Sequence, residues 1–125
     1  MLNKITFIFL LSLLPLLTYS QKINRYKNKE RQGKWIIYHD STHIDNIGRY
    51  RKGIPKGTWK YYDPQGMLLK QEKYRFKKIN TIYYHSNGKI QKQGKATIRQ
   101  EEKILHFFYY GDWLVYDSIG FLIKK

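Results

Sequence analysis

The chain has 125 residues, of which 17% are aromatic and none is cysteine, and its formal net charge is +15. The absence of cysteine excludes a disulfide-stabilised scaffold and lipid attachment at a cysteine, so a folded domain must rely on packing, for which aromatic rings supply large apolar surfaces. The excess of Lys and Arg favours polyanionic partners, but A/T-rich codons also enrich a protein in Lys, Ile, Tyr and Asn, so the charge has two explanations.

Residues 1–20 are predicted to be a secretory signal peptide. Lys4 gives the positive start, residues 5–17 form an uncharged apolar run, and Ser20 is a small residue before the expected mature N-terminus at Gln21. The run is shorter than the ~20 residues that span a bilayer, which favours a cleaved peptide over the alternative of an uncleaved anchor. We therefore expect an exported protein, in the periplasm, the cell envelope or the extracellular space, with no transmembrane span in the mature chain.

Residues 21–125 are expected to form one repeat domain with 23 basic and 9 acidic residues. Four units are predicted, at 26–47, 48–70, 71–92 and 106–125, and the first pattern recurs 24 residues later in the second unit. The signature residues are Gly33, Trp35 and Tyr38 in the first unit; Gly57, Trp59, Tyr62 and Gly66 in the second; Tyr84 and Gly88 in the third; and Gly111, Trp113, Tyr116 and Gly120 in the fourth.

The second and fourth units share the pattern G-x-W-x-x-Y-D-x-x-G-x-L, which predicts a strand, a turn and a returning strand. In the second unit, residues 58–62 are rich in β-formers, 63–66 carry Pro and Gly at turn positions, and 67–74 form the returning strand. Asn87-Gly88 carries the signal of a tight hairpin, and residues 52–57 read as a Gly/Pro turn between units. The fold class predicted is all-β, an elongated antiparallel meander of stacked hairpins with at least six strands.

An insertion of about ten residues near 96–106 separates the third unit from the fourth. It contains Gln100-Glu101-Glu102-Lys103, a good helix-forming stretch, but no clean apolar stripe, and the residues after it are strand-like. We predict a charged turn at 99–102, with a helix as the alternative, and no helix longer than two turns in 22–125.

Residues 50–66, which read YRKGIPKGTWKYYDPQG, resemble the bacterial variant of the MORN repeat, the membrane occupation and recognition nexus. The resemblance covers nearly the whole mature chain and departs at Lys29, where Gly is usual, and at Thr42, which replaces a turn Gly. It implies an elongated antiparallel sheet of stacked hairpins and no catalytic residues. Some relatives carry an antitoxin label, and eukaryotic MORN proteins are associated with membranes and with protein scaffolding.

The polar residues form no convincing catalytic or metal-binding motif. Ser41, His43 and Asp45 alternate along an extended chain about 6.5–7 Å apart, whereas a triad needs contacts of ~2.6–3.2 Å. His39 and His43 have a spacing that serves zinc best on a helix, which is not expected here. Glu101-Glu102 would point to opposite sides of a strand. We expect a protein that is not an enzyme and that holds no metal or cofactor.

Basic and aromatic residues alternate in Lys60-Tyr61-Tyr62 and in residues 73–78. This mixture suits either a nucleic-acid stacking platform or a half-buried sheet with lysine stems over rings, and export argues against nucleic acid. The expected function is a protein-interaction or scaffolding module of the cell envelope, with an unknown protein or envelope component as partner. A toxin-neutralising antitoxin is the alternative, and a binder of anionic lipid, such as an anionic membrane surface, or of polysaccharide is a weaker one.

The Trp and Tyr of each unit are three residues apart, so a regular strand places them on opposite faces. We predict that Trp35, Trp59 and Trp113 line one face as the main core. On the opposite face, half-exposed tyrosines among lysines form the candidate partner surface. That surface consists of Lys60, Tyr62, Tyr84 and Tyr116, with Tyr38 on the same face.

Overall fold

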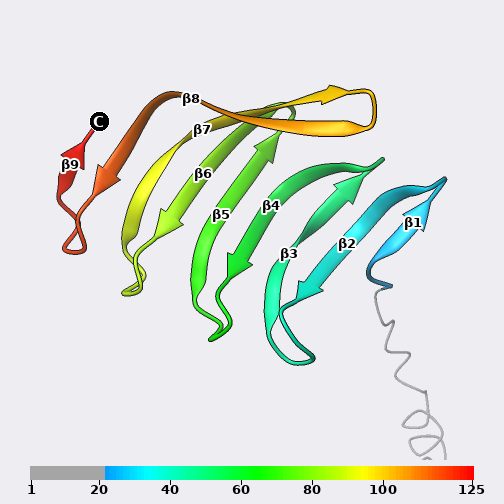
Figure 1. The fold of residues 1–125 in the computed structure, drawn as a ribbon, viewed down its shortest axis with the longest axis horizontal. Helices are drawn as coiled ribbons and strands as arrows, with labels where there is room; N and C mark the ends of the chain where they lie inside the picture. The colour runs from blue at the N-terminus through cyan, green and yellow to red at the C-terminus, as the bar shows by residue number, and fades with distance from the viewer. Residues whose placement is uncertain (1–21) are drawn as a thin grey trace, which may run out of the picture.

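A computed structural model describes residues 22–125, and the predicted signal peptide and the expected N-terminus at Gln21 lie outside that range. Nine antiparallel strands follow one another in a single open sheet, in the order β1 to β9, with each strand paired to the next (Figure 1). The strands are β1 Arg25–Lys27, β2 Glu30–Tyr38, β3 Ile44–Arg51, β4 Ile54–Tyr62, β5 Leu68–Arg75, β6 Lys78–Tyr84, β7 Ile90–Glu101, β8 Ile104–Tyr116 and β9 Leu122–Lys124.

The prediction of an all-β meander is confirmed over residues 22–125, which contain no helix, and so none that could cross a membrane. The insertion forms strand rather than helix, because β7 continues through Glu101 and pairs with β8. The charged turn predicted at 99–102 is therefore displaced to Glu102-Lys103. Likewise, the turn predicted at 52–57 is confined to Lys52-Gly53, because Ile54 already pairs with Arg51.

One end of the sheet is closed by four two-residue turns, after β1, β3, β5 and β7. The first residue of each turn has a positive φ of 50–57°, which is the left-handed conformation that favours Asn and Gly. Lys29 has a φ of 64° at the position where Gly53 has 77°, so the first unit tolerates strain where the resembled repeat has glycine. These turn residues are Asn28-Lys29, Lys52-Gly53, Phe76-Lys77 and Glu102-Lys103.

The opposite end carries longer loops, three of them with the same geometry. Gly66, Gly88 and Gly120 lie at matching corners with φ of 87°, 84° and 113°. The amide of each glycine donates to the carbonyl three residues earlier, at 2.9–3.1 Å. Asn87-Gly88 therefore lies in a longer loop of the same kind as the loop at Gly66, and not in the tight hairpin that the dipeptide suggested. The backbone hydrogen bond that closes the loop between β6 and β7 joins the His85 amide to the Lys89 carbonyl.

Aspartate stabilises two of these loops by accepting backbone hydrogen bonds. The Asp117 carboxylate accepts from the amides of Ile119, Gly120 and Phe121 at 2.9–3.0 Å, and these bonds lower its pKa. Asp63 plays the same part in the second unit. In the first unit Thr42 replaces the turn glycine, and the loop is held instead by Asp40, which accepts from the amides of Thr42 and His43 and has a lowered pKa.

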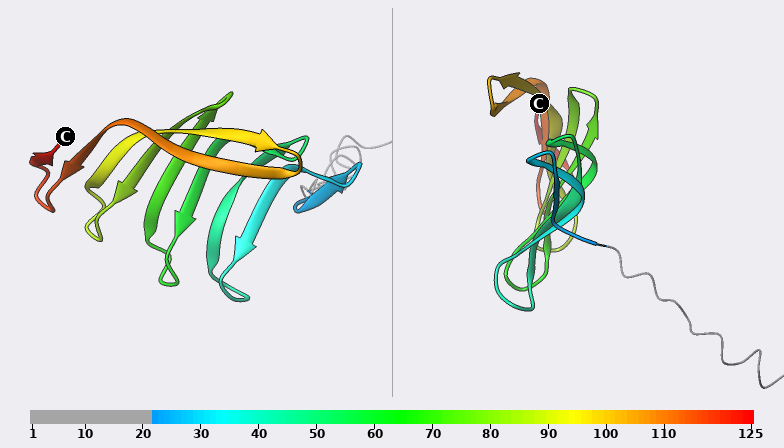
Figure 2. Two further views of the ribbon diagram at one scale, coloured as in Figure 1. Left: turned by 45° about the horizontal axis from the view of Figure 1, so that its top comes forward. Right: turned by 90° about the vertical axis from the view of Figure 1, so that its right-hand side faces the viewer.

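The described chain is one layer thick, so its core lies on one face of the sheet and not between two layers (Figure 2). The face that carries the tryptophans is called here the inner face. The outer halves of β7 and β8 form a long hairpin that passes across the ends of β6, β5 and β4 (Figures 1 and 2). Six apolar residues are buried: Trp35, Trp59, Tyr74, Ile79, Ala96 and Ile98.

Candidate functional site

The Gly-x-Trp signature places each tryptophan on the inner face through a distorted backbone. Gly33, Gly57 and Gly111 have positive φ of 66–75°. At Gly57 and Gly111 the pairing with the previous strand shifts, so three residues oppose one. This bulge turns the indole back over the preceding strand. Trp35 and Trp59 are buried, whereas Trp113 near the C-terminal edge is only half-buried, so the predicted three-tryptophan core is complete at two positions.

Two glycines that the sequence analysis did not single out receive the tryptophan rings. A Cβ atom built on Gly48 would fall inside the Trp59 ring, and one built on Gly94 would fall inside the Trp113 ring. Both positions lie within strands, where glycine marks a close approach of another group. The sequence signal that could have identified them is their separation of 46 residues, which is the length of two repeat units. The first and second units therefore correspond, as a pair, to the third and fourth units.

The histidines confirm this pairing of units. His39 Nε2 hydrogen-bonds the carbonyl of Tyr62 at 2.8 Å, and His85 Nε2 hydrogen-bonds the carbonyl of Tyr116 at 3.0 Å. His43 lies against Asp40 at 3.0 Å. These loop residues are engaged in turn contacts, and within residues 22–125 no three metal-ligating side chains converge.

At the middle of the sheet the Trp and Gly pair is replaced by a polar one. Glu72 occupies the place of Gly48, and Thr81 occupies the place of Trp35, with Glu72 and Thr81 directly opposed. Ile79 stands where the other units have a positive-φ glycine, and the β5–β6 register is regular. Both polar side chains are buried, at 6% and 1% exposure. The third unit therefore lacks both the tryptophan and the bulge that accompanies it at Trp59 and Trp113.

Glu72 is surrounded by groups that can share its charge. Lys70 Nζ lies 3.8 Å from its carboxylate, and the Tyr74 hydroxyl donates to it at 3.5 Å. Burial, and then the Glu72 carboxylate, raise the pKa of Tyr61 and of Tyr74 well above the ordinary value. Cations and rings alternate beside this cluster, since Lys70 lies 4.1 Å from the Tyr61 ring and Lys92 lies 4.5 Å from the Tyr83 ring.

The predicted partner surface lies on the face opposite the tryptophans, called here the outer face. Lys60 and Tyr62 line one shallow depression, of about 380 Å³. Tyr84 and Tyr116 are half-buried farther along, and Tyr38 is 46% exposed. Each Tyr lies next to a register shift, but the shift places the extra residue in the following strand, so Tyr and Trp remain on opposite faces.

Positive side chains follow one another across the outer face, directly opposed on β2, β3 and β4, and on β5 and β7 separated by Asn80 of β6. Lys34 pairs with Arg49, Arg49 pairs with Lys56, and Lys73 and Lys95 both pair with Asn80. These five cations are called here the cationic row. The strands between residues 46 and 100 contain a single acid, Glu72, and it faces the other side. The outer face therefore has positive neighbours at the strand spacing of about 4.8 Å with no acid between them.

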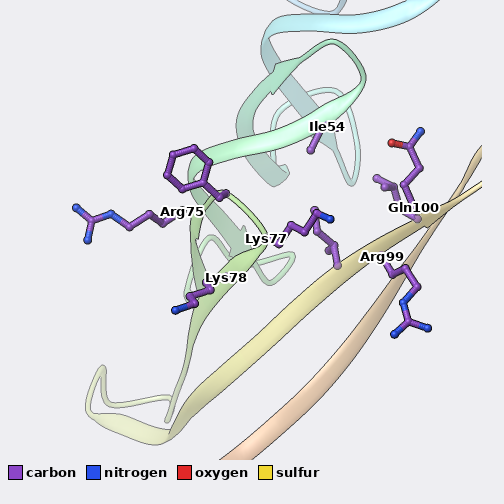
Figure 3. Close-up of a pocket in the computed structure, with 9 residues that line it drawn as sticks. Ile54, Arg75, Lys77, Lys78, Arg99 and Gln100 are labelled. Carbon is purple, nitrogen blue, oxygen red and sulfur yellow. The ribbon is translucent and has the colours of Figure 1, made fainter.

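A separate recess of about 780 Å³ lies beside the long hairpin (Figure 3). It is bounded by the start of β4, by the β5–β6 turn and by both strands of the hairpin. Its lining is apolar at four positions, basic at four and amide at one. The residues are Ile54, Phe76, Ile98 and Leu105; Arg75, Lys77, Lys78 and Arg99; and Gln100.

No family model, no curated protein and no solved structure matches this chain. The surfaces described above are thus interpreted from their own geometry and charge.

Proposed function

We propose that this protein is a non-enzymatic interaction module of the cell envelope, built on MORN-like repeats, that binds the acidic face of a protein partner through its outer face. The observation that carries the proposal is the cationic row, in which Lys34, Arg49 and Lys56 lie directly opposite each other on neighbouring strands. The proposed partner surface comprises the cationic row together with Lys60, Tyr62, Tyr84 and Tyr116.

The cationic row is costly for the isolated fold. Like charges directly opposed across strands destabilise a sheet, whereas opposite charges in the same places contribute about 0.2–1 kcal/mol per pair. Arg49 has a cation on either side, in Lys34 and Lys56, where one acid would satisfy both. The outer face carries charges that disfavour folding. A partner that supplies acidic residues opposite these cations would explain why they are there.

A protein partner suits this face better than a small ligand does. The depression at Lys60 and Tyr62 is shallow, and the row extends across β2 to β7. Specific protein interfaces bury about 800 Å² per partner and are enriched in Tyr and Arg. Half-buried tyrosine rings among exposed cations combine apolar contact area with charge complementarity.

Site-specific photocrosslinking in the native host tests the proposal. A photoreactive amino acid replaces Thr58, which is exposed in the depression between Lys56 and Lys60, and the matched control carries it at Gln65, in an exposed loop. We expect one protein adduct from position 58, absent from position 65 and lost when Arg49→Glu is added. The adduct's protein should carry an acidic surface patch. A lipid or polysaccharide adduct, no adduct, or a protein adduct that survives Arg49→Glu would overturn the proposal.

A further inference from the structure

We propose that the recess beside the β7–β8 hairpin is a binding site for a single-chain anionic amphiphile, namely an acyl chain that ends in a carboxylate or phosphate. This site is distinct from the outer face, and its role does not depend on the partner proposed above. Three segments that are distant in sequence form it: the start of β4, the β5–β6 turn and the hairpin.

The hairpin exists because β7 and β8 are 12 and 13 residues long, whereas β2 to β6 have between 7 and 9. Its base is fixed to the β5–β6 turn, since the Thr97 hydroxyl donates to the Lys77 carbonyl at 2.9 Å. The recess is therefore a product of the insertion, and it is larger than the depression of about 390 Å³ between the β3–β4 and β5–β6 turns, with which it shares Ile54 and Phe76. Its volume of about 780 Å³ is within the ~300–1,000 Å³ of small-molecule sites.

The apolar lining would hold the acyl chain. Ile98 is buried and forms part of the core, whereas Ile54 is 37% exposed. Phe76 is 95% exposed and has a φ of +57°. This φ is that of the first residue of a two-residue turn, as at Asn28 and Glu102, so the turn presents a large apolar ring to solvent beside the recess. Next to Ile54, Ile98 and Leu105, this exposed ring extends the apolar surface that the acyl chain would contact.

The basic lining would select the charge of the head group. Lys77 lies at the turn, and Arg75 and Arg99 stand on opposite sides of the recess with their guanidinium groups directed outward (Figure 3). No lining residue is acidic. Glu101 lies 3.6 Å from Arg99 in an exposed ion pair and neutralises at most one of the four cations. An apolar recess rimmed by cations matches an apolar chain with an anionic end.

Titration calorimetry on the full-length protein with laurate, below its micelle concentration, tests the assignment. We expect one laurate per chain, with dodecyltrimethylammonium, which has the same chain length and the opposite charge, binding at least tenfold more weakly. Decanoate should bind about tenfold more weakly than laurate, because two fewer methylenes are buried. Equal affinity for the two charge types, or no dependence on chain length, would overturn the proposal.

Two variants locate the site. Phe76→Gly removes the ring and relieves the positive φ, so laurate affinity should fall at least fivefold while the melting temperature is unchanged or higher. Lys77→Glu should weaken laurate binding and strengthen binding of the cationic amphiphile. Ile119→Ser is the matched control, because Ile119 is 67% exposed on a distant loop, and it should bind like the parent. Unchanged binding by Phe76→Gly and Lys77→Glu, or weakened binding by the control, would exclude this recess.

Discussion

At the scale of single residues, the packing of each repeat depends on glycine and tryptophan at matched positions. The positive-φ glycine of Gly-x-Trp opens a bulge, and a second glycine, on the preceding strand, leaves room for the indole. The Trp59 indole also donates a hydrogen bond to the Arg49 carbonyl at 3.2 Å. Rings then pack edge-to-face in a chain, since Tyr50 lies 5.7 Å from Trp35 and 4.9 Å from Trp59.

Gly48→Ala should destabilise the protein as much as loss of the Trp59 ring does, because the added methyl group would displace that ring. The added methyl group would occupy the position of the Trp59 ring, so we expect a loss of about 3–5 kcal/mol, the range for Trp→Ala in a core. In a Trp59→Ala background the same glycine substitution should cost less than about 1 kcal/mol, because the clash is gone. Chemical denaturation of the four proteins measures this cycle. Additive losses would show that Gly48 is required for some other reason.

Gly66→Val should be more destabilising than Gln65→Val, although neither position is crowded. Gly66 has a φ of 87° with no atom within 4 Å of a built Cβ, so only backbone strain opposes a side chain there. Left-handed backbone costs an L-residue about 1–2 kcal/mol, and more when the residue is β-branched. Thermal melts of both variants provide the comparison. Equal melting temperatures would contradict the loop geometry.

The third unit, β5 with β6, differs from its neighbours at the scale of elements. Its regular register and its Glu72 and Thr81 replace the bulge, the glycine and the tryptophan seen on either side. The unit is thus held by a buried carboxylate with lysine and tyrosine partners in place of ring packing. Ile79 and Thr81, the largest fully buried side chains among residues 22–125, lie here.

This cluster predicts alkaline sensitivity. Burial and Glu72 raise the folded-state pKa of Tyr61 and Tyr74, so folding retains both phenolic protons above pH ~10, where the unfolded chain loses them. Their contribution to stability is complete below pH ~10 and declines as pH rises beyond it. In Tyr61→Phe/Tyr74→Phe the number of protons released on unfolding at high pH should fall by about two. Denaturation curves between pH 8 and 11 measure this, and parallel profiles for parent and variant would refute the assignment.

At the largest scale, residues 22–125 form an open sheet whose inner face carries the apolar core and whose outer face is basic. The inner face buries its rings against one another and beside Ala96 and Ile98 of β7, whereas the outer face exposes cations between strands. The two proposed sites use different parts of this architecture, the flat outer face and the hairpin recess.

Arg49→Glu should stabilise the free protein while abolishing partner binding. The new carboxylate would face Lys34 and Lys56, converting two repulsive cross-strand pairs into attractive ones and adding about 1 kcal/mol. The substitution leaves the hydrogen bond to Trp59 intact, because the indole donates to the backbone carbonyl of residue 49 and not to its side chain. Denaturation at low and high salt should show the gain shrink as salt is added. A destabilised variant would mean that the cationic row is structural.

Much of the fold follows from local sequence. Alternation of β-formers with turn residues determines strands and hairpins, and the Trp and Tyr spacing of three determines which ring lies on which face. These features depend on residues close in sequence, so periodicity alone reveals them. The basic character of the outer face follows in the same way, since Lys60 and Lys73 occupy alternate positions away from Trp59 and Glu72.

Contacts between strands were decided only by tertiary structure. Gly48 is required by a ring that is 11 residues away in sequence, and Glu72 is buried opposite Thr81, where other units have a tryptophan. The path of the β7–β8 hairpin over the sheet brings Ile54 to Leu105, across 51 residues, and creates the recess. Sequence patterns record what each residue prefers along its own strand. Which side chain fills the space above a neighbouring strand depends on register and on bulges, and these are set by the paired strands together.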